Sequence, residues 1–503
     1  MSLHSDVPRT NASGRARLLP SREPSTIATV KRLGRSLALP VLLLAFVSSV
    51  HAVEPWGTYR GNPQRTGNTD GKAGPATPKV LWAYKTKEHF LASPVPAGDR
   101  LFVSGLGAFN VASFLCLSTE PKASNRVVWS KSAPFLKLPT VSSPGIDKDR
   151  LVFGDGMHQT DGASLYCVSV ASGSPLWQLP IPGKLVHLEG SPTIANGKVY
   201  IGGGAAGVVC VELDKVTFEG KQMEVAAIRK LLDQHWKKLQ AKYLEQKKKD
   251  PDFAIPPSED QLPRAAPLRT WQQGQEKWHV DAPVNVDGDR VLVGSAYLDK
   301  EKVGDRALFC LDAAKGTIRW RAPLKFNPWG GASIKDNVAI VSGSSIGYDT
   351  HLLKGAKGQM AAIDLATGKE KWKKDVPGGI VACAAIADGA AIVAATDGKV
   401  RAFEVARGDR RWIYEAKAPL FAPVAVAGNT VYAGDLKGVI HAIDLKTGQP
   451  QWTLNLGSHG DVKAPGMVYG GPIVHAGRLY VATCNLEGPF AREATVVVCI
   501  GEK

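Results

Sequence analysis

The chain has 503 residues and a formal net charge of +16, with 44% hydrophobic and 21% charged residues. This composition is that of an ordinary globular protein, so wholesale disorder is excluded. The 52 glycines and 33 prolines favour many short strands joined by turns, which argues against a mainly helical protein. The positive charge is spread along the chain, and the basic run at 247–249 is too short to predict specific nucleic-acid binding.

Residues 1–52 have the pattern of a signal peptide. A polar and basic stretch that ends at Arg35 precedes an apolar stretch from Leu37 to Val47. The apolar stretch is shorter than the ~20 residues of a membrane-spanning helix, and cleavage is predicted after Ala52. The alternatives are a true start further downstream and an uncleaved anchor. Once cleaved, the protein is predicted to lie in the periplasm or outside the cell and not in the membrane.

Beyond the leader, the chain repeats a motif that consists of a small residue, a turn and a tryptophan. The clearest copies run from Ala362 to Trp372 and from Ala442 to Trp452. In each copy the aspartate can accept hydrogen bonds from the turn, and the glycine supplies the positive φ that a tight turn needs. The glycine stands four residues before the tryptophan, at Gly316, Gly368, Gly408 and Gly448.

The tryptophans divide the chain into units of four strands. We assign the fourth strand of each unit to one tryptophan, namely Trp82, Trp129, Trp177, Trp278, Trp320, Trp372, Trp412 and Trp452. The last unit has only three strands before Lys503, whereas Trp82 stands before the first unit. The Trp82 strand is therefore predicted to complete the last unit, so that no sheet edge stays open. The expected fold class is all-β, an eight-bladed β-propeller over residues 53–503.

The third unit contains an insertion, which we place at residues 215–271. Val225, Ile228, Leu232, Leu239 and Tyr243 recur at helical spacing, and the pattern predicts an amphipathic helix that ends near residue 250. Its apolar stripe is expected to pack on the propeller, with a partner-binding helix as the alternative. A proline-rich return path follows. The insertion belongs to one face of the propeller, and the long loops after Gly154, Ser295, Gly343 and Thr483 belong to the opposite face, where binding is expected.

The motif A-x-D-x-x-T-G-x-x-x-W resembles the repeat of PQQ-like (pyrroloquinoline-quinone-type) propellers, and the resemblance covers roughly residues 80 to 500 except for the insertion. Two branches share this repeat: quinone-dependent dehydrogenases, and non-catalytic propellers similar to the BamB-type outer-membrane assembly proteins. The first branch is expected to carry an adjacent cysteine pair beside the cofactor, and sometimes a C-x-x-C-H haem site. This sequence has neither motif.

The resemblance therefore favours an exported binding or scaffold propeller of the BamB-like branch, without catalysis or a cofactor of its own. A protein or cell-envelope partner is expected, and the protein is expected to be a monomer. The alternative is a PQQ-dependent oxidoreductase that binds PQQ together with calcium. Cys116, Cys167, Cys210, Cys310 and Cys499 occupy the small position of the repeat, so we interpret them as buried side chains and not as disulfides.

One polar group stands out from the repeat. His187 and Glu189 form a His-x-acid pattern before one innermost strand, and His279 and Asp281 form the same pattern before the next. Two imidazoles and two carboxylates would suit a divalent metal or a polar ligand at the mouth of the channel. Local hydrogen bonding at the surface is the alternative. In the following unit Asn327 and Trp329 stand at the equivalent place, and Trp329 could serve there as a stacking platform or as a core residue.

Overall fold

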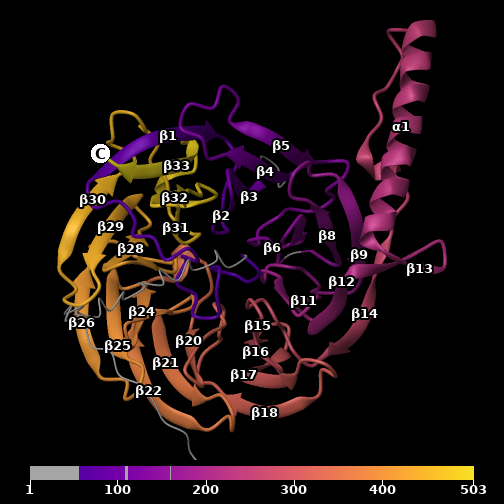
Figure 1. Ribbon diagram of the computed structural model, residues 1–503. Helices are drawn as coiled ribbons and strands as arrows, with labels where there is room; N and C mark the ends of the chain where they lie inside the picture. Colours follow the sequence, from indigo (N-terminus) through magenta and orange to yellow (C-terminus); the bar gives the residue numbers. More distant parts are fainter. Residues whose placement is uncertain (1–55, 108–110, 159) are drawn as a thin grey trace, which may run out of the picture. The chain divides into compact units, whose positions relative to one another are not determined.

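The computed structural model describes residues 56–107, 111–158 and 160–503, and the predicted signal peptide lies outside them. Within the compact unit His51–Lys503, eight antiparallel sheets are arranged around one axis as the blades of a β-propeller (Figure 1). The predicted fold class is thus confirmed. None of the helices among the described residues combines the length and the apolar character that crossing a membrane requires.

Each blade has four main strands from the channel to the periphery, and the sheet of blade 3 has a short fifth strand. The strands follow one another in chain order except in blade 8, where the outermost strand is β1. Blades 1 and 2 consist of β2 (Val95–Ala97), β3 (Arg100–Leu106), β4 (Ala112–Ser118), β5 (Val127–Ser132), β6 (Gly145–Asp147), β7 (Arg150–Gly154), β8 (Ala163–Ser169) and β9 (Pro175–Ile181). Blades 3 and 4 consist of β10 (Thr193–Ala195), β11 (Lys198–Gly202), β12 (Val208–Phe218), β14 (Ala266–Gln273), β15 (Asn285–Asp287), β16 (Arg290–Leu298), β17 (Val303–Asp312) and β18 (Ile318–Pro323).

The second half of the ring follows the same plan. Blades 5 and 6 consist of β19 (Ala332–Lys335), β20 (Val338–Ser344), β21 (Lys357–Asp364), β22 (Glu370–Pro377), β23 (Ala385–Ala387), β24 (Ala390–Ala395), β25 (Lys399–Glu404) and β26 (Arg410–Glu415). Blades 7 and 8 consist of β27 (Ala425–Ala427), β28 (Thr430–Gly434), β29 (Val439–Asp444), β30 (Pro450–Asn455), β31 (Ile473–His475), β32 (Arg478–Ala482), β33 (Thr495–Glu502) and β1 (Pro78–Thr86).

Blade 8 closes the ring with strands from distant parts of the chain. The strand β1 pairs with β33 along its whole length, and Trp82 lies opposite Cys499 (Figure 1). Since β1 precedes blade 1 and β31 to β33 follow blade 7, the closure is made by backbone hydrogen bonds. No blade of the described ring lacks its fourth strand.

In each blade a tryptophan of the outermost strand lies opposite a small residue of the third strand. The pairs, in order of the blades, are Trp129 with Cys116, Trp177 with Cys167, Trp271 with Cys210, Trp320 with Cys310, Trp372 with Ala362, Trp412 with Ala402, Trp452 with Ala442, and Trp82 with Cys499. The Trp320 indole donates a hydrogen bond of 3.0 Å to the Leu365 carbonyl of the next blade. A Cβ at Gly368 (φ +71°) would lie 2.7 Å from the Trp320 ring, so the glycine lets neighbouring blades pack closely.

One assignment from the sequence was wrong, because Trp271 and not Trp278 occupies the repeat position of blade 3. Trp271 lies in β14 opposite Cys210, and its indole donates to the Ala313 carbonyl at 3.0 Å. Trp278 follows the strand and stacks on Phe309, with ring centroids 4.1 Å apart. The insertion separates Cys210 from its partner strand, so the spacing of the repeat cannot identify the tryptophan there.

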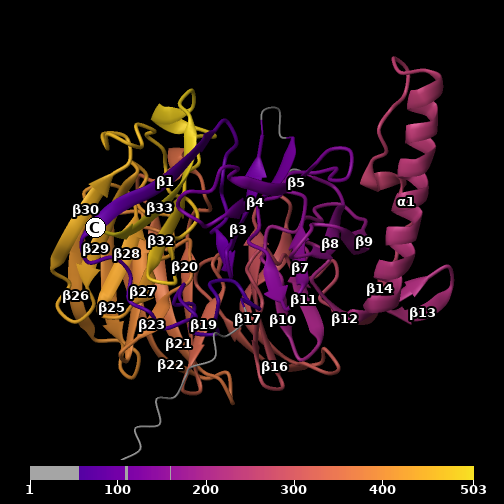
Figure 2. The same ribbon diagram turned by 45° about the horizontal axis from the view of Figure 1, so that its top comes forward.

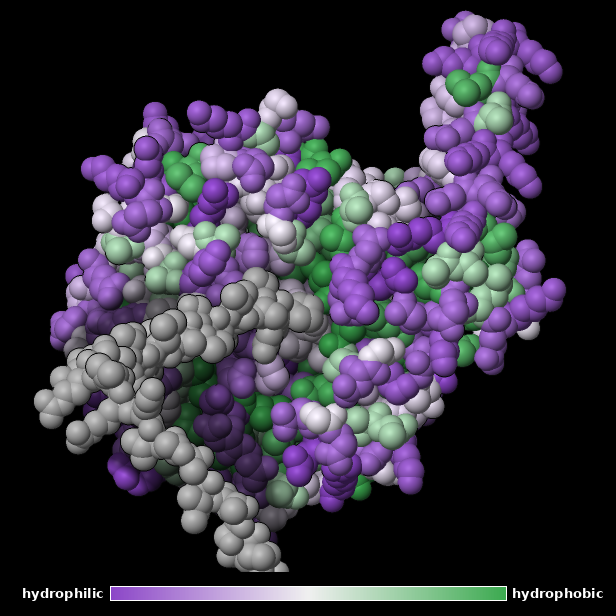
Figure 3. Space-filling view, in the orientation of Figure 1, coloured by the Kyte–Doolittle hydropathy of each residue, from purple (hydrophilic) through white to green (hydrophobic). Residues whose placement is uncertain are grey.

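The predicted helix is α1 (Val225–Lys249), which follows a short strand, β13 (Lys221–Glu224), and extends beyond the edge of the ring (Figures 1 and 2). Val225, Ile228 and Leu232 are buried against blades 2 and 3. Trp236 and Leu239 are partly buried against the same cluster. Beyond them the helix is mostly exposed, and its surface is mainly hydrophilic (Figure 3). The apolar stripe therefore packs on the propeller over the first turns of the helix only.

The insertion is shorter than the predicted range 215–271, because both ends of that range belong to the sheet of blade 3. Val216 and Thr217 of β12 pair with Pro267 and Ala266 of β14. The alternation of polar and apolar residues in β12 is interrupted at Asp214 and Lys215, where the pairing with β14 shifts register, so the sequence pattern placed the end of the strand too early. Short 3₁₀ turns complete the described structure, namely Glu259–Gln261 in the return path, Thr350–Leu352 and Gly488–Phe490.

An unexpected element, residues 56–67, crosses the central channel, and we call it the central plug. Its carbonyl oxygens accept hydrogen bonds of 2.5–3.2 Å from the innermost strands of six blades, through the amides of Ile146, Ile194, Ile334, Ile386, Val426 and Val474. Arg60 donates to the carbonyls of Pro472 and Val424, and Arg65 donates to the Val284 carbonyl at 3.2 Å. The plug thereby joins blades that are far apart in the sequence.

Both plug arginines are fully buried and bind mainly carbonyl oxygens. Burial disfavours the charged form, and it lowers the pKa of Arg65 to about 10 and lowers the pKa of Arg60 as well. The Arg65 guanidinium therefore stays charged at neutral pH. Carbonyl dipoles stabilise its charge, as they stabilise cations at the end of a helix.

Candidate functional site

A cavity of about 620 Å³ opens at the end of the channel where the innermost strands begin. Its wall is built from the links before these strands and from loops between second and third strands. The lining residues from the links include Ser93, Ser143, Ser191, Pro283 and Gly330, and those from the loops include His158, Tyr348 and Leu486. Tyr59 of the central plug also lines the cavity, and the plug bonds to the inner strands deeper in the channel. The cavity is therefore open at the end of the channel and bounded by the plug on its inner side.

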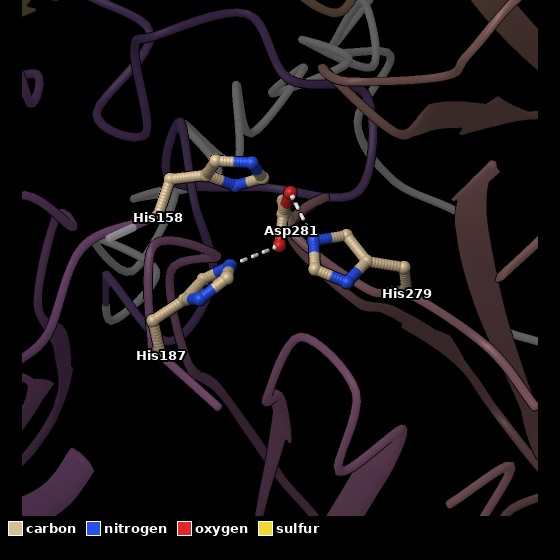
Figure 4. A group of neighbouring side chains, drawn as sticks. All are labelled: His158, His187, His279 and Asp281. Carbon is tan, nitrogen blue, oxygen red and sulfur yellow. Dashed lines mark hydrogen bonds and ion pairs between the residues drawn. The ribbon is translucent and has the colours of Figure 1, made fainter. Parts of the chain in front are cut away.

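Four side chains converge at one side of this cavity, and we call them the histidine cluster: His158, His187, His279 and Asp281 (Figure 4). His158 comes from the loop between β7 and β8, His187 from the link before β10, and the other two from the link before β15. One nitrogen or oxygen atom of each residue lies within 4.8 Å of those of the other three. The predicted meeting of His187, His279 and Asp281 is thus seen in the structure.

Asp281 is at the centre of the histidine cluster. Its two carboxylate oxygens lie 2.8 Å from Nε2 of His187 and 3.0 Å from Nε2 of His279. Both imidazole side chains are fully buried, and the Asp281 side chain is only 7% exposed. The carboxylate therefore interacts with imidazoles from two different blades in an environment that contains little water.

The backbone around the histidines holds them in place. The His279 amide donates a hydrogen bond of 3.1 Å to Oγ of Ser295, a buried residue of β16. Beside His187, Gly204 has φ +55°, and a Cβ there would lie 3.1 Å from the imidazole ring. A side chain at position 204 would therefore displace the imidazole, which explains why a glycine is needed there.

The loop that carries His158 is anchored by Asp155. The Asp155 carboxylate accepts hydrogen bonds from the Ser164 amide at 2.5 Å and from the Tyr166 hydroxyl at 2.8 Å. Its backbone carbonyl accepts from the Leu188 amide at 3.1 Å, which connects the loop to the link that carries His187. Burial raises the pKa of Asp155 to about 6. This anchor lies three residues before His158 and keeps it near the other cluster members.

Glu189 lies beside the cluster without taking part in its contacts to Asp281. Its carboxylate accepts a hydrogen bond from the His158 backbone amide and lines the cavity. Burial and the nearby charge of Asp281 raise the pKa of Glu189 to about 7. Glu189 is therefore near the midpoint of its titration at neutral pH.

The charges of the cluster are coupled. Burial favours a neutral carboxyl at Asp281, but the imidazoles of His279 and His187 outweigh it and lower the pKa of Asp281 far below its usual range. Burial also favours a neutral His187, but Asp281 outweighs it and raises the pKa of His187. The pKa of His158 is lowered by burial. Asp281 is therefore a carboxylate under all physiological conditions.

Of the remaining two predicted site residues, Asn327 and Trp329, only Trp329 lines the cavity. Asn327 does not line the cavity, because its amide group is used elsewhere: Oδ1 accepts from the Tyr297 amide and from Arg306, both at 2.9 Å. Asn327 thereby braces the neighbouring loop, as an Asn before a strand can, and its role in ligand binding stays a prediction. Trp329 does line the cavity, and among the described residues its indole nitrogen has no hydrogen-bond partner.

A second acidic group lies on another part of the cavity wall. It consists of Asp349, His351 and Glu487, from the loops between β20 and β21 and between β32 and β33. Glu487 accepts hydrogen bonds of 2.9 Å from the Tyr469 hydroxyl and from the Thr350 hydroxyl. Both hydroxyls bond the same oxygen, Oε1, and the group contains only one imidazole, so it offers fewer nitrogen ligands than the histidine cluster.

The sequence pattern missed His158 and the central plug. His158 carries no repeat signature, and its only signal is its place in the long loop after Gly154 on the expected binding face. The plug lacks strand periodicity, because its partners are the innermost strands of six different blades. Only the closing of the ring places these segments next to the other site residues.

Comparison of the sequence with known protein families identifies the family of this chain. The family model described as "Outer membrane protein assembly factor BamB" matches residues 72–231 and 329–500. No curated protein sequence matches the chain at a significant level.

Several solved structures are similar in fold. BamB from Moraxella catarrhalis has a TM-score of 0.54 and 15% identity, over 84% of this chain and 97% of that one. A europium-containing methanol dehydrogenase has a TM-score of 0.59 and 13% identity, over 90% of this chain and 98% of that one. The quinohemoprotein alcohol dehydrogenase from Comamonas testosteroni has a TM-score of 0.58 and 14% identity, over 90% and 82%. At these identities the similarity shows the fold alone.

Proposed function

Because the chain belongs to the PQQ-like propeller family described as outer membrane protein assembly factor BamB, we propose that it is an exported binding and scaffold propeller. Its site is the cavity at the end of the channel, and its occupant is a segment of a protein partner in the cell envelope. The chain does not catalyse a reaction of its own in this proposal. Export rests on the leader pattern of residues 1–52, with cleavage after Ala52, four residues before Trp56 of the central plug.

The cavity itself is the observation that carries the proposal. Exposed apolar side chains gather at its rim, where Tyr348, Leu352 and Leu486 are each at least 41% exposed. A mainly apolar cavity with a few polar groups, continued by exposed apolar side chains at its rim, is typical of a binding site. The rim loops are long and lie on a rigid ring, the arrangement in which binding residues are usually found.

The lining of the cavity favours a cationic segment. It contains the carboxyl groups of Glu189, Asp281, Asp349 and Glu487, and no lysine or arginine is found among its described lining residues. Tyr59, Trp329, Tyr348 and Tyr469 add aromatic rings, which attract Lys and Arg side chains through their faces. A basic and partly apolar segment would therefore complement this surface.

The same lining argues against the alternative function, a PQQ-dependent oxidoreductase. PQQ carries several carboxylates, and the described lining offers no lysine or arginine to pair with them, so these residues do not fit the cofactor. We expect that purified protein mixed with PQQ and calcium and passed through gel filtration will retain no quinone absorbance. Quinone retained in a stoichiometric amount would favour the oxidoreductase instead.

Site-specific cross-linking in intact cells tests the binding function. A photoreactive amino acid in place of Leu486 at the rim is expected to give an adduct with one defined envelope protein. The same probe in place of Ile413, a similarly exposed residue of β26 on the outside of the ring, is expected to give none. Equal adducts from both positions, or no adduct from Leu486, would contradict the proposal.

A substitution that fills the cavity provides a second arm of this experiment. A Cβ at Gly347 would have no heavy atom closer than 4.0 Å, so Gly347→Trp should occupy the cavity without disturbing the backbone. We expect it to abolish the Leu486 adduct. Gly460→Trp is the matched control, because Gly460 is exposed and a Cβ there would have no neighbour within 4 Å. An adduct that survives Gly347→Trp would place the partner outside the cavity.

A further inference from the structure

We infer that the histidine cluster is a binding site for a divalent first-row transition metal of the zinc class, with His158, His187, His279 and Asp281 as its ligands. The inference does not depend on the partner proposed above. It rests on the arrangement of these four side chains, on their unsatisfied nitrogen atoms and on their chemistry.

The spacing of the cluster agrees with a tetrahedral ion. The imidazole centroids of His158, His187 and His279 are 5.2, 5.3 and 5.6 Å apart, which makes the three rings nearly equidistant. Three imidazoles bound to one zinc ion at Zn–N distances of about 2.0–2.1 Å have centroids on the order of 5 Å apart. The rings therefore need little movement to bind one ion.

Asp281 occupies the place of a fourth ligand. Its oxygens lie 2.8 Å from Nε2 of His187 and 3.0 Å from Nε2 of His279. The edge of a zinc tetrahedron is about 3.3 Å, so a small widening of these two contacts would admit the ion. Figure 4 shows the three imidazoles around this carboxylate.

Buried nitrogen atoms of the cluster lack a partner within the described part of the chain. They are the Nδ1 atoms of His187 and His279, and both side chains are fully buried. Nε2 of His279 has the ionic contact of 3.0 Å to Asp281 but makes no hydrogen bond with a described residue. Buried polar atoms are normally hydrogen-bonded, and each exception needs an explanation. A metal ion beside Asp281 would bind the Nε2 atoms, and it would give Nε2 of His279 the directed bond that this atom lacks.

The ligand chemistry selects the class of metal. Three imidazoles and one carboxylate suit zinc and its neighbours, whereas calcium and magnesium prefer oxygen ligands. A divalent cation would also balance the negative charge of the buried Asp281 carboxylate. His158 and Asp281 line the cavity, so an ion can reach the site from the open end of the channel.

Calorimetry on the purified, tag-free protein tests the site after chelator treatment and removal of the chelator. We expect one Zn²⁺ to bind per chain, and Ca²⁺ to bind at least 100-fold more weakly. Cobalt(II) is expected to give the intense visible absorption of a tetrahedral ion and to be displaced by zinc. A wild-type protein that binds no zinc, or that binds calcium equally well, would overturn the inference.

Variants identify the ligands. His158 lies on an exposed loop, so His158→Ala should preserve the fold and weaken zinc binding by about 10- to 100-fold or more. The double variant His187→Ala, His279→Ala is expected to abolish it, with circular dichroism as the check on folding. His351→Ala, in the second acidic group of the cavity, is the matched control and should leave binding unchanged. Zinc binding that His158→Ala does not alter would show that the cluster is only a hydrogen-bonded network.

Discussion

At the scale of single residues, the contact between blades depends on a glycine that accepts the face of an indole. Gly316 of blade 4 has φ +70°, and a Cβ there would lie 2.6 Å from the Trp271 ring of blade 3. The adjacent Ala313 carbonyl accepts the indole hydrogen bond of the same tryptophan. The glycine therefore serves both the turn of its own blade and the packing of the preceding one.

We predict that Gly316→Ala destabilises the protein more than Gly197→Ala does. Gly197 has φ +71°, but a Cβ there would meet no atom within 4 Å, so its substitution costs only the backbone strain of about 1–2 kcal/mol. At Gly316 the clash with Trp271 adds about 1–3 kcal/mol. Urea unfolding followed by tryptophan fluorescence measures both. Equal losses of unfolding free energy would show that the contact with the indole does not restrict this position.

At the scale of elements, the helix α1 has two parts with different roles. Its first turns belong to the core between blades 2 and 3, because Ile228 packs with Trp177 and Val216 in one buried cluster. The later turns carry exposed side chains such as Leu244 and the basic run Lys247, Lys248 and Lys249. The helix is therefore an integral part of blade 3 at one end only.

We predict that Ile228→Ala lowers the unfolding free energy by about 2–5 kcal/mol, because it leaves a cavity in a packed core. Leu244→Ala is the matched control from the same helix and should change it by less than about 0.5 kcal/mol. Thermal or urea unfolding of the two variants measures the loss of unfolding free energy in each. A similar effect of both substitutions would mean that the buried and exposed parts of α1 are not distinct.

At the scale of the whole molecule, two segments near the start of the described chain hold the ring closed by bonding to blades that lie far away in the sequence. The strand β1 completes blade 8, and the central plug binds the innermost strands of six blades. Since successive blades pack mainly against their neighbours, only these two elements and the packing of blade 8 on blade 1 oppose the opening of the ring.

We predict that deletion of residues 56–67 increases hydrogen exchange at the innermost strands. The amides of Ile146, Ile334 and Val474 would lose their carbonyl partners in the plug. Amides of the third and outermost strands, such as those between Ala442 and Trp452, should exchange as before if the ring persists, and the midpoint of thermal unfolding should fall. Unchanged exchange at the innermost strands would show that the plug contributes nothing to their protection.

The local pattern of the sequence determined the fold class, because each blade repeats a strand, a turn and a tryptophan whose periods are short. The motif at Ala362–Trp372 is enough to locate one outermost strand and its turn. The same local reasoning failed at Trp278, where the insertion interrupts the repeat and only the pairing of Cys210 with Trp271 identifies the strand.

What the sequence by itself determined is therefore the class of the fold, its number of blades and the approach of His187, His279 and Asp281 from two consecutive links. Only the tertiary structure placed His158 beside them and Asn327 away from the cavity, because both depend on how a loop folds back over the ring. It alone showed that residues 56–67 form a plug. This segment bonds to six different blades, so its sequence shows no strand periodicity, and its partners come together only when the ring has closed.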